Sequence, residues 1–261
     1  MFILTTILQK RLGAFAGGLL GLLVISSGII TAGNTARAQD GLSGGSYVTP
    51  FPSGDVYQLR VIGDSLAEGL HGVARDSLAV DARINVNRQR WVFNSLLSSR
   101  FSRKLRALKQ DLKNDHVNIA VVMIGTWDRR SVEDKSGRRQ RVGSPGWREV
   151  LSRRVDAIMR TLKDLKLAVY WVGLPPLRKG KANAVAQVIN EVIRERAYLR
   201  GLKYIDVYTS FADDRGGYSA YGPDLTGKIR LLRERDGIHF TFQGNRKLAH
   251  FVERELKRDL K

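Results

Sequence analysis

The sequence predicts a three-layer α/β/α sandwich with a mostly parallel sheet of five strands. Short apolar segments alternate along the chain with segments whose apolar residues recur at helical spacing. Two of the short segments, residues 117–125 (VNIAVVMIG) and 167–174 (LAVYWVGL), are almost wholly apolar. Such strands are typical of the centre of a parallel sheet that is covered by helices on both faces.

The first strand is expected over residues 56–62, an apolar run that Gly63 ends. A helix over about residues 65–80 follows, because its leucines and valines keep roughly helical spacing. Residues 83–88 alternate apolar and polar side chains, which favours a second strand.

The middle of the chain is expected to supply two helices and two central strands. Residues 96–112 repeat apolar positions with a clean helical period before the strand at 117–125. Residues 126–145 are polar, charged and glycine-containing, and are expected to form a long loop over the end of the sheet. A helix over 146–166 then leads into the strand at 167–174.

The last part of the chain begins with an expected helix over residues 183–199 and a fifth strand over residues 203–208. Residues 209–235 are rich in Gly and Tyr and show no strong period, so an irregular excursion is expected there. Residues 242–260 form a final amphipathic helix by their apolar spacing. Ligands of such folds bind where the strands end.

The first 38 residues have the pattern of an export signal. Lys10 and Arg11 precede an apolar stretch over residues 12–30, and Ala36-Arg37-Ala38 fits a cleavage site. We expect a signal peptide over 1–38; an uncleaved signal anchor is the alternative, because the apolar stretch can also span a bilayer. Both place the domain outside the cytoplasm, either in the periplasm or anchored to the inner membrane and facing the periplasm.

Two further regions follow this signal: a flexible lead-in over residues 39–54, rich in Gly, Ser and Pro, and one domain over residues 55–261. The chain has no cysteine, so disulfides, thiol chemistry and cysteine-based metal sites are excluded. It shows no Gly-rich nucleotide loop and no close set of metal-ligand residues, so no cofactor and no metal are expected.

The net charge of +19 points to an anionic partner. Nucleic acid is not expected, because the domain is predicted to be exported and contains no nucleic-acid-binding motif. Acylated anionic envelope material, such as lipopolysaccharide, acidic polysaccharide or peptidoglycan, is favoured. The alternative is a generally basic surface without a specific partner, since net charge governs association more than specific function. The sequence leaves the oligomeric state open.

Ser65 stands at a strand-to-helix turn, in Gly63-Asp64-Ser65-Leu66. A serine at this turn is exposed beside free backbone N–H groups and the positive end of a helix, which suits a nucleophile. The alternative is that Asp64 or Ser65 caps the helix. Among the four histidines, His239 stands apart because Asp236 precedes it by three residues in a loop, where a carboxylate can orient the imidazole. The alternative is a solvated pair.

These motifs resemble those of the SGNH hydrolases, also called GDSL-type esterases, together with a glycine-initiated turn at Gly125. Four segments resemble more closely an exported bacterial branch of that superfamily catalogued as a domain of unknown function. They are residues 142–149 (VGSPGWRE), 170–176 (YWVGLPP), 218–224 (YSAYGPD) and 236–241 (DGIHFT). The resemblance covers about residues 56–260 and implies the flavodoxin-like fold of the superfamily.

The resemblance also implies roles for the candidate catalytic residues. Ser65 is the expected nucleophile, His239 the general base and then acid, and Asp236 the residue that orients His239. The expected reaction is acyl transfer through an acyl-enzyme to water or to another hydroxyl. O-acetyl groups of envelope polysaccharide or peptidoglycan are candidate substrates.

The sequence departs from the family pattern at the oxyanion hole, where the family uses the serine N–H, a glycine N–H and an asparagine. In Gly125-Thr126-Trp127-Asp128, Trp127 takes the place of the asparagine, and Asn94 or Ser95 takes the place of the glycine. Loss of one such donor typically lowers the rate by about 10²–10³. Either Trp127, Asn94 or Asn87 supplies a replacement donor, or the chain is a degenerate hydrolase that binds an anionic envelope ligand.

Five other residues are candidates for the pocket. Thr126, Asp64 and Asp128 flank the two turns and are expected near the oxyanion. Arg129 and Arg130 follow the second turn and are expected to bind an anionic substrate, because guanidinium groups suit carboxylates and phosphates. The alternative for the arginines is a solvated charged loop.

Overall fold

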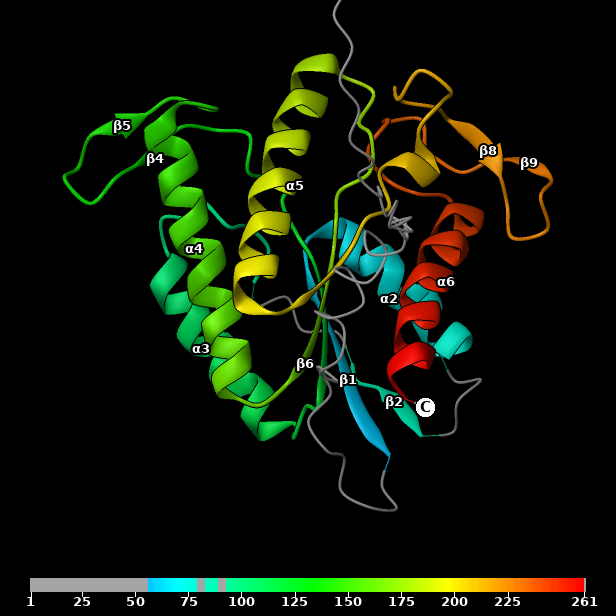
Figure 1. Cartoon of the computed structure of the whole chain (residues 1–261), viewed down its shortest axis with the longest axis horizontal. Coiled ribbons are helices and arrows are strands. Elements are labelled where there is room, and N and C mark those ends of the chain that lie inside the picture. The colour runs from blue at the N-terminus through cyan, green and yellow to red at the C-terminus, as the bar shows by residue number, and fades with distance from the viewer. Residues whose placement is uncertain (1–55, 79–82, 89–92, 261) are drawn as a thin grey trace, which may run out of the picture. The chain divides into compact units, whose positions relative to one another are not determined.

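The computed structural model describes residues 56–78, 83–88 and 93–260, and the expected signal and lead-in lie outside these residues. Its centre is a five-stranded sheet in the order β2-β1-β3-β6-β7, in which every neighbouring pair is parallel (Figure 1). The strands are β1 (Tyr57–Gly63), β2 (Ile84–Val86), β3 (Ile119–Met123), β6 (Ala168–Val172) and β7 (Lys203–Ile205).

Helices cover both faces of the sheet. They are α2 (Ser65–Leu78), α3 (Phe101–Asn114), α4 (Pro145–Asp164), α5 (Gly180–Arg200) and α6 (Phe242–Asp259). Helices α2 and α6 pack together on one face, and α3, α4 and α5 form the other layer (Figure 1). All residues of β3 and β6 are buried, as expected for central strands. The predicted α/β sandwich is confirmed, and the sheet is wholly parallel.

The predicted helix over residues 96–112 is wrong at its start, since α3 begins at Phe101. The backbone N–H groups of Leu96 and Leu97 donate to the carboxylate of Asp128, which lies over thirty residues away in the chain. This long-range contact holds the preceding stretch as a loop and overrides its helical pattern.

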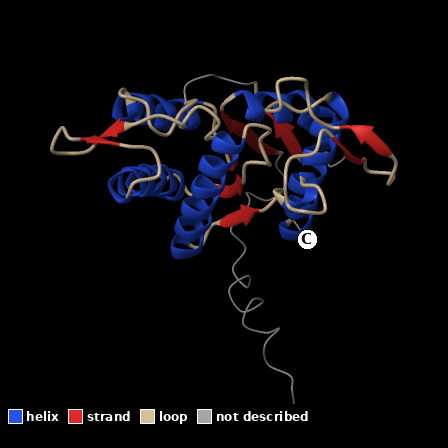
Figure 2. Ribbon diagram, turned by 90° about the horizontal axis from the view of Figure 1, so that it is seen from above, coloured by secondary structure: helices blue, strands red, loops and turns tan. Residues whose placement is uncertain are grey.

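Two stretches expected to be irregular contain short antiparallel hairpins. Residues 126–145 include β4 (Val132–Glu133) and β5 (Arg139–Gln140). Residues 209–235 include the 3₁₀ turn η1 (Thr209–Phe211), β8 (Tyr221–Pro223) and β9 (Ile229–Leu231). Strands of two or three residues are too short to show an alternating pattern. The hairpins project on opposite sides of the described domain (Figure 2).

Gly63 is required where β1 ends. Its φ is +153°, and a Cβ at this position would lie 1.8 Å from the carbonyl oxygen of Met123 on the paired strand β3. Only glycine allows the backbones to approach this closely. The approach brings the end of β1 against the end of β3 and so places the turns that follow them side by side.

Helix caps fix two further boundaries. The Ser144 hydroxyl accepts a hydrogen bond from the N–H of Trp147, with Pro145 at the first helical position, and the Thr241 hydroxyl accepts from Gly244. The second cap determines where α6 begins, just after His239. No helix among the described residues is both long and apolar enough to cross a membrane.

Candidate active site

The candidate site lies at the carboxyl ends of the parallel strands. Ser65 is the first residue of α2, directly after β1, and His239 precedes the cap of α6. Because α2 and α6 pack along each other, their amino-terminal ends bring Ser65 and His239 together. The turn after β3 and the loop after β6 complete this edge.

Ser65, His239 and Asp236 form one continuous chain of hydrogen bonds. The Ser65 hydroxyl oxygen lies 2.7 Å from Nε2 of His239. On the other side of the ring, Nδ1 of His239 contacts Oδ2 of Asp236. The second carboxylate oxygen, Oδ1, accepts from the backbone N–H groups of Ile238 at 2.8 Å and of His239 at 3.0 Å. The structure therefore brings together the three residues that the sequence selected as catalytic candidates.

The carboxylate of Asp236 is held in its ionised form. Burial alone would raise the pKa of Asp236, but the N–H groups of Ile238 and His239 and the His239 ring outweigh it and lower the pKa to about 2. An ionised carboxylate only accepts hydrogen bonds, so Nδ1 of His239 carries the proton. Nε2 is then free to accept the hydroxyl proton of Ser65.

Arg233 fastens the loop that carries Asp236 and His239. Its side chain is 1% exposed and donates to the carbonyl oxygens of Pro176 and Ile238, both at 2.7 Å. The guanidinium also lies 4.6 Å from the centre of the Phe240 ring. Burial lowers the pKa of Arg233 to about 10. No sequence pattern predicts this role for Arg233, because its partners are backbone carbonyls that only the fold brings close.

Gly237 allows the same loop to lie against the β6–α5 loop. Its φ is +72°, and an added Cβ would lie 2.4 Å from Cβ of Arg178. The backbone N–H of Arg178 donates to the Gly237 carbonyl at 3.1 Å. These contacts and those of Arg233 fix the Asp236–His239 turn on the end of the sheet.

Asp64 caps α2 and ties it to the turn after β3. Oδ1 accepts from the N–H of Leu66 at 3.1 Å, and Oδ2 accepts from the N–H groups of Gly125 at 2.9 Å and Thr126 at 2.8 Å, and from the Thr126 hydroxyl at 2.6 Å. Burial raises the pKa of Asp64, although these hydrogen bonds oppose the shift. The cap proposed for this turn is therefore Asp64, which leaves the Ser65 hydroxyl to His239.

Asp128 plays a similar part for the loop before α3. It accepts from the Ser95 hydroxyl at 2.7 Å and from the N–H groups of Leu96 and Leu97 at 2.8 and 2.7 Å. Burial raises the pKa of Asp128 against the effect of these bonds.

The expectation that Asp64, Thr126 and Asp128 line the pocket is corrected by their burial. Their exposed fractions are 1%, 3% and 0%, and their side-chain oxygens are occupied by the loop contacts. These side chains hold the turns in place from inside the protein and are not accessible to a ligand.

The candidate oxyanion donors lie in different settings. Trp127 is 57% exposed, although both of its neighbours in the turn are buried. Asn94 is also exposed, and its amide oxygen accepts from Nζ of Lys104 at 2.7 Å. The contacts of Asn87 come from its backbone. Its N–H donates to the Leu59 carbonyl at 2.8 Å, and its carbonyl oxygen lies 2.9 Å from Nε2 of His71. Only Trp127 has a large exposed side chain on the turn after β3.

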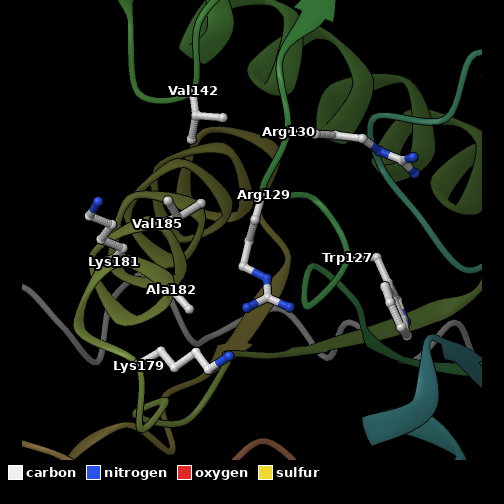
Figure 3. A pocket seen from close by; sticks show the side chains of 8 residues that line it. All are labelled: Trp127, Arg129, Arg130, Val142, Lys179, Lys181, Ala182 and Val185. Carbon is white, nitrogen blue, oxygen red and sulfur yellow. The ribbon is translucent and has the colours of Figure 1, made fainter.

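A pocket of about 640 Å³ opens beside Trp127 (Figure 3). Its walls come from the segment after β3 and the amino-terminal end of α5. Its lining residues are Trp127, Arg129, Arg130, Val142, Lys179, Lys181, Ala182 and Val185. Nε of Arg129 donates to the carbonyl of Thr126 at 2.8 Å. Figure 3 shows the ends of Arg129 and Lys179 turned toward each other, whereas Arg130 points away.

Metal-ligand clusters are not seen in the part of the chain that the structure describes: no group of three or more His, Cys, Asp or Glu residues is placed to hold an ion.

Comparison with known structures places this geometry in a known fold. A GDSL-like lipase from Bacteroides thetaiotaomicron VPI-5482 aligns with a TM-score of 0.55 at 13% identity, covering 86% of this chain and 98% of the lipase. An acetyl xylan esterase aligns with a TM-score of 0.52 at 15% identity, covering 76% of this chain and 99% of the esterase. An acetyl-xylooligosaccharide esterase from Geobacillus Stearmophilus aligns with a TM-score of 0.51 at 15% identity, covering 78% and 95%.

A search of curated proteins found no match to the sequence. A family model described as "Protein of unknown function (DUF459)" matches residues 58–255, which is most of the chain. The chain therefore belongs to the DUF459 family, and its fold is that of the SGNH, or GDSL-type, hydrolases.

Proposed function

We propose that this protein is an exported serine esterase that hydrolyses or transfers acyl groups with Ser65, His239 and Asp236. The observation that carries the proposal is the unbroken chain from the Ser65 hydroxyl through the His239 ring to the Asp236 carboxylate. A nucleophile, a base and an orienting carboxylate in hydrogen-bond reach are the arrangement that acyl transfer requires. The lipases and esterases that share the fold are consistent with it.

The proposed reaction has two halves. Nε2 of His239 takes the hydroxyl proton as the Ser65 oxygen attacks the ester carbonyl, and Asp236 stabilises the imidazolium that forms. The imidazolium then gives this proton to the leaving alcohol, and the acyl group stays on Ser65. In the second half, Nε2 of His239 takes a proton from water or from another hydroxyl as its oxygen attacks the acyl carbonyl. The bond to Ser65 then breaks, the imidazolium returns the proton to the Ser65 oxygen, and the acyl group leaves as an acid or as a new ester.

Charge on the tetrahedral intermediate needs donors at its oxygen. One is the backbone N–H of Ser65, since the first N–H groups of a helix point out of its end without helical partners. The exposed indole of Trp127, on the turn after β3, is the proposed second donor. It replaces the asparagine that the resemblance leads one to expect there.

The proposed substrates are O-acyl esters of the envelope, acetyl esters of a polysaccharide or of peptidoglycan among them. The proposed location is the periplasm, either free or on an inner-membrane anchor, as the amino-terminal segment indicates. Acetyl esterases share the fold, which supports a small acyl group.

Hydrolysis of p-nitrophenyl acetate and acetate release from O-acetylated glycans test the proposal. Wild-type protein is expected to turn over both, and Ser65→Ala is expected to lose at least about 10³-fold in rate. Ser102→Ala removes another serine hydroxyl, from the exposed side of α3, and should leave the rate unchanged. A wild-type protein without turnover that still binds the glycans would favour the degenerate, binding-only alternative.

A further inference from the structure

The pocket beside Trp127 lies at the same end of the sheet as the proposed catalytic centre, although Ser65, Asp236 and His239 do not line it. Its walls come from the segments that follow β3 and β6, which are neighbours in the sheet, and β1 lies on the other side of β3. Ser65 follows β1, and the Asp64 carboxylate binds the turn that carries Trp127. A substrate whose ester lies at Ser65 can therefore extend across Trp127 into this pocket.

Every charged residue that lines the pocket is a cation. These residues are Arg129, Arg130, Lys179 and Lys181, and the other lining residues are apolar. Among residues 56–78, 83–88 and 93–260, no carboxylate lies within salt-bridge distance of these four cations. Arg130 has an electrostatic interaction with the buried carboxylate of Asp128, which acts against burial to lower the pKa of that carboxylate. The positive charges of Arg129, Lys179 and Lys181 are thus left without a fixed counter-charge.

The end of α5 adds to this positive field. Lys179 is its N-cap and makes no capping bond with its side chain, and Lys181 lies in the first turn. The helix dipole contributes partial positive charge at this end. Arg129 is positioned by its bond to the Thr126 carbonyl, and Figure 3 shows the end of its side chain turned toward that of Lys179.

We infer that this pocket binds an anionic group, a carboxylate or a phosphate, on the alcohol part of the substrate. It thereby makes the enzyme selective for acyl esters whose alcohol part is negatively charged. The inference rests on the proposed esterase function and names its substrate class. The volume of about 640 Å³ accommodates a sugar acid or a phosphorylated group rather than a single small ion. Val142, Val185 and the Trp127 ring supply apolar contact for the body of such a group.

The test compares paired substrates in a matched pair of variants. The substrates are acetyl esters of hydroxyalkyl carboxylates and of hydroxyalkyl phosphates, each in a series of chain lengths. Each is compared with a neutral ester in which the carboxylate or phosphate is fully methylated. Lys179→Gln/Lys181→Gln removes two cations from the pocket, and Lys109→Gln/Lys113→Gln removes two exposed lysines from α3. Arg129 is kept because it also holds the turn.

The wild-type enzyme is expected to have a higher kcat/KM for each anionic ester than for its neutral counterpart. The pocket variant should lose about tenfold of that preference, since two exposed ion pairs contribute about that factor. The α3 variant should keep the preference. A preference for the carboxylate or for the phosphate series identifies which anion the pocket takes. Equal loss in both variants, or no anionic preference in the wild type, overturns the inference.

Calorimetric binding to a Ser65→Ala background separates this inference from the proposed function. The same anionic esters should bind that protein about tenfold more tightly with Lys179 and Lys181 present than with both replaced. If wild-type protein fails to hydrolyse even the neutral esters, the esterase proposal fails. If the affinities for the anionic esters do not differ, the pocket inference fails by itself.

Discussion

The Ser65 hydroxyl oxygen and Nε2 of His239 lie 2.7 Å apart, although the two residues are 174 positions apart in the chain. The contact exists because α2 and α6 pack together and begin at the same edge of the sheet. Each partner is fixed by its own loop: Asp64 caps the helix that carries Ser65, and Arg233 holds the turn that carries His239.

Asp236→Asn is expected to lower kcat for p-nitrophenyl acetate by roughly 10³-fold, because an amide does not hold the His239 tautomer that accepts the serine proton. The backbone bonds to Ile238 and His239 can persist through the amide oxygen, so the fold should be retained. Steady-state kinetics and circular dichroism of the same preparation check both parts. A variant with wild-type kcat would remove Asp236 from the mechanism.

The lowered pKa of Asp236 also predicts a pH dependence of stability. A carboxyl whose folded pKa of about 2 lies below its unfolded value stabilises the fold above the unfolded pKa, near 3.9. This contribution is lost as the pH falls from about 4 through about 2. The difference in unfolding free energy between wild type and Asp236→Asn should therefore shrink over that window in urea denaturation. A difference that grows toward acid pH would contradict the assigned direction.

Arg233→Lys is expected to lower kcat more than it changes KM, by about tenfold, because a lysine cannot bind the Pro176 and Ile238 carbonyls together. Loss of one buried bond should also lower the unfolding free energy by about 1–3 kcal/mol. Arg235→Lys, two residues away and exposed, is the matched control. If Arg233→Lys loses stability but keeps wild-type kcat and pH profile, Arg233 is structural only.

Trp127 has two informative replacements. Trp127→Phe keeps the ring but removes the indole N–H, and it is expected to lower kcat by about 10-fold or more if that N–H stabilises the oxyanion. Trp127→Asn restores the residue that the family resemblance implies and is expected to raise kcat. Because the side chain is 57% exposed, neither change should shift the melting temperature by much. Wild-type kcat in both variants would exclude Trp127 as a donor.

Asp128→Ala is expected to lower the unfolding free energy by about 3 kcal/mol, because it leaves the buried donors of Ser95, Leu96 and Leu97 without their acceptor. Asp76→Ala, on the exposed side of α2, should change it by less than about 0.5 kcal/mol. Chemical denaturation measures both. Equal effects would show that the bonds to Asp128 do not hold the loop before α3.

The central strands and the candidate residues Ser65, Asp236 and His239 could be predicted from the sequence, because apolar runs and short turn motifs are local signals. Features that depend on contacts between distant segments could not be predicted. The start of α3 depends on Asp128, and the clamp of Arg233 depends on Pro176 and the Phe240 ring. Lys179 and Lys181 gave no signal as pocket residues, because only the fold sets them beside Arg129.

Reaction of the wild-type protein with a fluorophosphonate, followed by peptide mass spectrometry, shows whether Ser65 is an activated nucleophile. The reagent reports an activated serine without any knowledge of the natural substrate. One labelled peptide is expected, modified at Ser65, with labelling lost in Ser65→Ala and strongly slowed in His239→Ala. Absence of label on Ser65 in folded wild-type protein would contradict the proposal that this residue is a nucleophile.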